Sequence, residues 1–97
     1  MKYIYTITGV EDPFNAVSHR RCFGWFTTLD EAVDAVETNR CEIRECLYDY
    51  MIIEQFSPGL YCGVQEEWWW KWNRKRKKFL RIKKPKKISN VINWGIG

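Results

Sequence analysis

The chain has 97 residues, of which 45 % are apolar and 16 % aromatic, and its formal net charge is +4. This length builds one hydrophobic core, so we expect a single domain over residues 1–97, and the aromatic content excludes a disordered chain. The start alternates polar and apolar residues, and no apolar run is long enough to cross a bilayer, so we expect a cytoplasmic protein without a signal peptide or membrane partner.

The N-terminal third predicts two strands. Residues 3–8 alternate with a period of two and favour β-structure, and Gly9 is expected to end this first strand. Residues 11–15 predict a loop, because Pro13 fixes its own backbone and disfavours helix before it. Residues 23–26 predict a short aromatic strand that pairs antiparallel with the first.

The clearest local signal predicts a helix over about residues 29–38. Thr28 and Glu31 fit a capping box, in which the Thr28 hydroxyl accepts the Glu31 backbone N–H and the Glu31 carboxylate reaches back to the cap. Asn39 is expected to end the helix in the left-handed conformation. The apolar stripe Leu29, Ala32, Val33 and Val36 faces the core, and Asp30, Glu31, Asp34 and Glu37 form an acidic outer face.

The middle of the chain predicts the centre of a sheet. Residues 42–46 are compatible with one further helical turn. Residues 48–56 predict the central strand, because residues 51–53 are apolar on both faces. Ser57, Pro58 and Gly59 then predict a hairpin turn.

The returning strand is expected to begin at residues 60–62, and residues 68–72 either continue it or form a separate strand. Further strands are expected at 79–82 and 91–94. The predicted fold is α+β: an antiparallel sheet of about five strands with one main helix, at about 29–38, packed on one face.

The four cysteines do not indicate a metal site. Cys41 and Cys46 form the only near pair, and no second pair matches them as zinc ligation requires. Two disulfides with three possible pairings are conceivable, but without a secretion signal we expect reduced thiols.

Charge divides the chain into two blocks. Residues 1–67 hold five basic and twelve acidic side chains, a net charge of −7, whereas residues 68–97 hold eleven basic and no acidic side chains, a net charge of +11. Such asymmetry indicates a dedicated electrostatic surface.

The basic-aromatic segment, residues 68–87, is the candidate binding surface. A strand here sends Trp68, Trp70 and Trp72 to one face, and Trp69 and Lys71 to the other. The rings either supply core or leave a stacking platform for a nucleobase, and the basic runs 74–78 and 83–87 either keep the protein soluble or contact phosphate. The candidate ligand-binding residues are Trp70, Trp72, Arg74, Lys75, Arg76, Lys78, Arg81 and Lys83.

Catalytic signals are lacking. No G-x-S-x-G, H-E-x-x-H or glycine-rich phosphate loop occurs. The single histidine, His19, stands three positions before Cys22, a spacing that points the two to opposite faces of a strand. We therefore expect no catalytic residue, no metal and no cofactor, although a pocket around His19 and Cys22 would revive a small hydrolase.

In size, single capped helix and aromatic-basic end, the chain resembles small accessory proteins of bacteriophages and mobile elements. The resemblance implies a protein that binds and blocks, in the host-cell cytoplasm. We expect a non-enzymatic protein that binds or sequesters an anionic ligand, either a signalling nucleotide or nucleic acid, to inhibit a host defence system. The alternative is a protein–protein inhibitor or self-assembling subunit whose basic block docks on an acidic protein surface, which would give a homo-oligomer.

Overall fold

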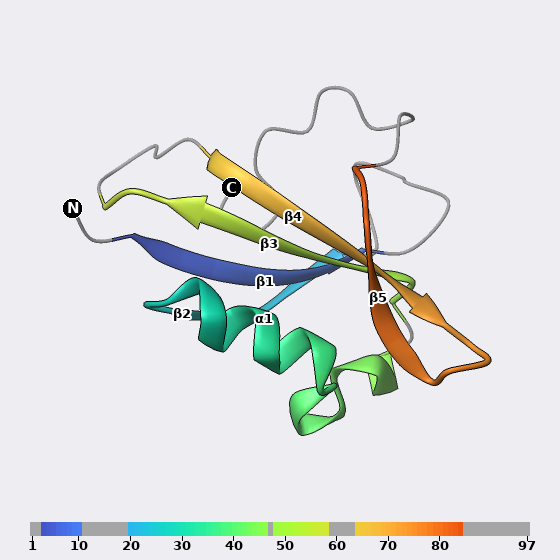
Figure 1. Cartoon of the computed structure of the whole chain (residues 1–97). Helices are drawn as coiled ribbons and strands as arrows, with labels where there is room; N and C mark the ends of the chain where they lie inside the picture. Colours follow the sequence, from blue (N-terminus) through green and yellow to red (C-terminus); the bar gives the residue numbers. More distant parts are fainter. Residues whose placement is uncertain (1–2, 11–19, 47, 59–63, 85–97) are drawn as a thin grey trace.

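The structure is a computed structural model that describes residues 3–10, 20–46, 48–58 and 64–84. Five strands form one antiparallel sheet in the order β2-β1-β3-β4-β5, and the helix α1 covers one of its faces (Figure 1). The elements are β1 (Ile4–Val10), β2 (Arg20–Phe26), α1 (Leu29–Glu37), the 3-10 helix η1 (Arg40–Cys46), β3 (Tyr50–Phe56), β4 (Val64–Asn73) and β5 (Lys78–Ile82). The predicted α+β fold is confirmed. No helix in these ranges is long and apolar enough to cross a membrane.

The ends of α1 follow the sequence signals. The Glu31 backbone N–H donates to the Thr28 hydroxyl at 3.3 Å, and the chain turns left-handed at Asn39, with a φ of 51°. One detail differs from the expected capping box: the Glu31 carboxylate accepts the hydroxyl proton of Thr28, at 2.9 Å, instead of a backbone N–H. The helix start therefore rests on a reciprocal pair between these two side chains.

β1 extends beyond its predicted end, whereas β3 begins at Tyr50, two residues later than predicted. Gly9 does not end β1, which continues to Val10. A side chain at Gly9 would come within 2.8 Å of both Phe23 and Tyr48, whose rings meet edge to face with centroids 5.9 Å apart. Gly9 is thus a strand residue without a side chain, because two aromatic rings occupy the space above it.

The central and C-terminal predictions have different outcomes. β3 is the middle strand, as expected, and residues 68–72 belong to one continuous strand, β4. The predicted loop at 11–15 and the predicted strands at 60–62 and 91–94 lie outside the described residues.

Both faces of the sheet carry apolar side chains. On the face covered by α1, Met51, Ile53, Trp70 and Phe79 pack against Ala32, Ala35 and Val36 of the helix. On the other face, Tyr50, Ile52 and Trp69 form a second cluster with Val10. The alternation of β4 places Trp68, Trp70 and Trp72 toward the helix and Trp69 away from it, as predicted.

Trp70 connects three elements. Its side chain is fully buried, and its indole N–H donates to the Glu37 carboxylate at the end of α1, at 3.1 Å. The Arg81 guanidinium of β5 lies over its ring, 5.1 Å from the centroid. Trp70 therefore fixes the positions of α1 and β5 relative to β4.

We predict that Trp70→Phe lowers the free energy of unfolding by about 1 to 3 kcal/mol, because the smaller ring leaves a cavity and removes the hydrogen bond to Glu37. Trp68→Phe is the matched control, since Trp68 is only half-buried on the same face of the same strand. Urea denaturation measures both. An equal or larger loss in Trp68→Phe would contradict the connecting role of Trp70.

Candidate functional site

The β4–β5 hairpin concentrates positive charge in its turn. Asn73 and Lys78 form the last pair of the ladder, and the four residues between them, 74–77, are all lysine or arginine. The Asn73 side-chain oxygen accepts the Arg76 backbone N–H at 2.9 Å, which closes the turn. We call Arg74, Lys75, Arg76, Lys77 and Lys78 the turn cations; all five are exposed. The turn lies at one end of the molecule (Figure 1).

The turn cations differ from the other cations of this segment. Lys84 pairs with Glu67 at 2.9 Å, Lys71 lies over the Tyr50 ring and Arg81 lies over the Trp70 ring. Within the part of the chain that the structure describes, no ion pair involves a turn cation. Two like unit charges repel even in water, by about 1 kcal/mol at a separation of 4 Å and by less at longer range, so five neighbouring cations carry a repulsive cost that a bound anion would reduce.

Lys77 adds a second cost. Its φ is 52°, in the left-handed region where glycine or asparagine is favoured, and an ordinary L-residue there is strained by about 1 to 2 kcal/mol. A glycine would relieve both the strain and one of the repelling charges. Compared with glycine, the lysine at position 77 adds a positive charge to the turn and lowers the stability of the protein.

Two hollows adjoin the turn. One has a volume of about 480 Å³ and the other about 470 Å³, and both are lined by Lys71, Trp72 and Arg74. Leu80 and Ile82 give the first an apolar floor, whereas Asp49 borders the second. Both volumes lie in the range of about 300 to 1,000 Å³ that is typical of ligand pockets. An apolar floor with a cationic rim suits a ligand that joins flat or apolar groups to negative charges.

The structure brings only some of the predicted site residues together. Arg74, Lys75, Arg76 and Lys78 lie in the turn, but Lys83 lies beyond the far end of β5. Five residues of strand span about 17 Å, so the second basic run begins well away from the first. Residues 85–87 of that run lie outside the described residues.

Trp70 and Trp72, the two tryptophans predicted to bind a ligand, both pack against other side chains of the protein. Trp70 has no exposed surface, so its ring is not available to stack on a base. Trp72 is half-buried, with the Arg44 guanidinium 5.1 Å from its ring centroid and Phe79 edge to face at 5.0 Å. Arg81, which was expected to point outward, is exposed but rests on Trp70.

Sequence reasoning left out several residues of this site. Lys77 belongs to the turn, and its place in the run of five cations was a sufficient signal. Lys71, Leu80 and Ile82 line the first hollow because they share a face across the β4–β5 pair, which only the strand register reveals. Arg44 reaches Trp72 from η1, and no local pattern indicates that contact.

The residues that the structure describes do not form a metal site. No group of three or more histidine, cysteine, aspartate or glutamate side chains is placed to hold a metal ion among the residues described. His19 lies outside them, whereas Cys22 and Cys41 are exposed free thiols. The candidate site, as far as its residues are described, is a surface of cations.

Comparisons with known proteins do not add a family to this geometry. The chain has no match among protein-family models, curated proteins or solved structures.

We predict that Lys77→Gly raises the free energy of unfolding by about 0.5 to 1 kcal/mol, because glycine adopts a positive φ without strain. Lys78→Gly removes the same charge from a strand position, where glycine costs about 0.5 to 1 kcal/mol. Urea denaturation of both variants separates backbone strain from charge. A loss of stability in Lys77→Gly as large as that in Lys78→Gly would contradict the strained turn.

Proposed function

We propose that the chain is a non-catalytic binding protein whose β4–β5 hairpin contacts the phosphate backbone of a nucleic acid. The observation that carries the proposal is the set of five turn cations, which have no ion-pair partner in the described chain, whereas Lys84 of the second basic run has one. Dense lysines and arginines attract phosphate because binding releases the counterions condensed around it. The turn presents these charges at one end of the molecule, where an extended ligand can reach them.

The spacing of the cations favours a polymer over a single nucleotide. The turn cations and Lys83 are separated by the length of β5, about 17 Å. A single nucleotide occupies the turn or one hollow, whereas a nucleic acid backbone carries a charge every few ångströms and follows the hairpin. A nucleobase would lie in the hollow above Leu80 and Ile82, beside Lys71.

The contacts of the acidic helix favour this function over docking on another copy. Asp34 of α1 pairs with Arg40, and Glu37 accepts the Trp70 indole N–H. Glu31 accepts the hydroxyl of Thr28. Three of the four carboxylates that would receive a neighbour's basic turn therefore have partners within their own chain.

The wider role that we propose is to sequester the bound nucleic acid and thereby to block a host defence system.

We predict that the double variant Arg74→Ala/Arg76→Ala binds a fluorescein-labelled 20-nucleotide single strand at least tenfold more weakly at 100 mM salt. Each lost phosphate contact flattens the plot of log affinity against log salt by about 0.7 for single strands, so the slope should flatten by about 1.4. Fluorescence anisotropy measured across a salt series gives both quantities.

The matched control is Arg21→Ala/Arg40→Ala, which lowers the net charge equally but beside the opposite edge strand: Arg21 is in β2, and Arg40 of η1 lies over the ring of Phe26 in β2. It should change the affinity less than threefold. Equal weakening by the two double variants would mean that net charge alone attracts the strand, and the hairpin would lose its role. A salt-sensitive oligomer without nucleic acid binding, seen by light scattering, would favour docking between copies instead.

A further inference from the structure

Leu80 of β5 has an apolar side chain that the described core does not use. It is half-buried, yet within the described chain it packs into neither of the two apolar clusters of the sheet. Lys71 is its cross-strand partner, and Ile82, two residues further along β5, shares its face. Leu80 and Ile82 form the floor of the first hollow, whose volume is about 480 Å³. This apolar floor therefore faces a hollow beside the turn and not a packed interior.

Two of the turn cations, Arg74 and Lys75, line the same hollow. Both are exposed, and no ion pair in the described ranges involves either of them. Along a nucleic acid strand each phosphate is joined to a base through one sugar. A strand held at Arg74 and Lys75 therefore brings a base within reach of the apolar floor.

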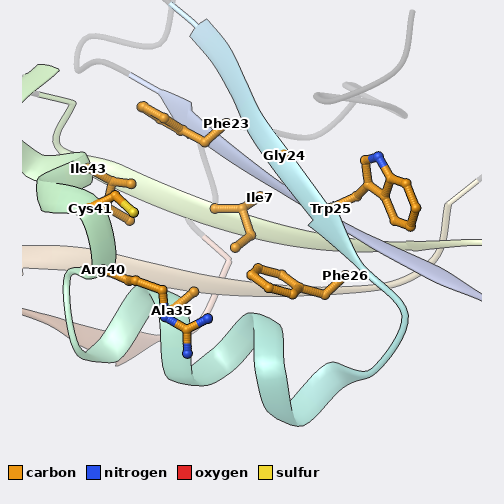
Figure 2. Close-up of a pocket in the computed structure, with 9 residues that line it drawn as sticks. All are labelled: Ile7, Phe23, Gly24, Trp25, Phe26, Ala35, Arg40, Cys41 and Ile43. Atoms are coloured by element: carbon orange, nitrogen blue, oxygen red, sulfur yellow. The ribbon is translucent and has the colours of Figure 1, made fainter.

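A second cavity shows what this combination adds. It has a volume of about 270 Å³ and lies between β2, α1 and η1, where Ile7, Phe26 and Ile43 contribute apolar side chains (Figure 2). Its lining includes no turn cation, and its own cation, Arg40, pairs with Asp34. Of these two spaces, only the first hollow joins an apolar floor to turn cations.

The hairpin is not a free arm of the kind that enters a duplex. The major groove, about 12 Å wide, admits a two-stranded ribbon. Here β4 pairs with β3 as far as Lys71, and the Trp72 backbone N–H donates to the Asp49 carbonyl at 2.9 Å. On the helix side of the hairpin, the Arg44 guanidinium of η1 lies over the Trp72 ring. The hairpin thus offers its turn and the face that carries Leu80.

We propose that the hairpin binds single-stranded nucleic acid in preference to duplex, because the first hollow takes one unstacked base. This preference rests on the proposed function, since phosphate contact at the turn brings the strand to the hollow. The flat face of the base lies on Leu80 and Ile82, and Arg74 and Lys75 contact the phosphates beside it. In a duplex the neighbouring base pairs cover both faces of a base, whereas the bases of a single strand can be splayed out.

The test compares three ligands with the same fluorescent label: a 20-nucleotide oligothymidylate, an abasic strand with the same number of phosphates, and the duplex of the oligothymidylate with its complement. Duplex DNA carries one charge per about 1.7 Å of its length, about twice the density of one strand, so attraction to charge alone makes the duplex the tightest ligand. A base in the hollow reverses this order. Fluorescence anisotropy at 100 mM salt should show the oligothymidylate binding about fivefold or more tightly than either of the others.

Leu80→Ala should weaken oligothymidylate binding about threefold or more, because it shrinks the apolar floor, and should leave the affinity for the abasic strand unchanged. The matched control is Ile43→Ala, which removes a half-buried apolar side chain from the lining of the second cavity. It should change neither affinity.

Two results would each overturn the preference: an abasic strand or a duplex that binds as tightly as the oligothymidylate, or equal weakening of both single strands by Leu80→Ala. In either case, salt-dependent binding that is lost in Arg74→Ala/Arg76→Ala would still support phosphate contact at the turn. If none of the three ligands shows salt-dependent binding, the proposed function itself fails, and the preference fails with it.

Discussion

The hydrogen bond between the Trp70 indole and Glu37 is the interaction on which the rest of the arrangement depends. It joins the end of α1 to the middle of β4, and the Arg81 guanidinium on the same ring adds β5. Because the Trp70 ring is fully buried, this one side chain fixes the position of α1 on the sheet and the position of β5 beside β4. The charged turn is presented outward because the strands behind it are held in this way.

The cations of the described chain fall into three groups according to what they contact: aromatic rings, a carboxylate, or neither. Arg21, Arg40, Arg44, Lys71 and Arg81 lie over aromatic rings, where a cation gains about 0.5 to 1 kcal/mol at exposed sites. Lys84 meets a carboxylate. The turn cations have neither kind of partner in the described chain, and Lys77 is strained as well. A net charge of +4 conceals this division, which is why the distribution of charge is more informative than its sum.

The elements of the fold could be predicted because their signals are local. The Thr28 cap, the left-handed Asn39 and the alternation around Trp70 are each set within a few residues, and the structure has them as expected. The candidate site could be predicted only in part, since exposure of a tryptophan depends on which helix covers it. The hollow beside Lys71, the place of Arg44 on Trp72 and the cavity beside β2 all arise between elements distant in sequence. Gly9 shows the same limit: the rings that keep it in the strand come from Phe23 and Tyr48.

The central claim is that the turn cations meet phosphate, and the most direct measurement is an amide chemical-shift titration with a 12-nucleotide oligothymidylate. The account predicts that the largest shift changes fall on residues 74–78 and Lys71, that Leu80 and Ile82 follow, and that added salt reverses them together. Changes centred on α1 or β2, with the turn amides unmoved, would contradict it.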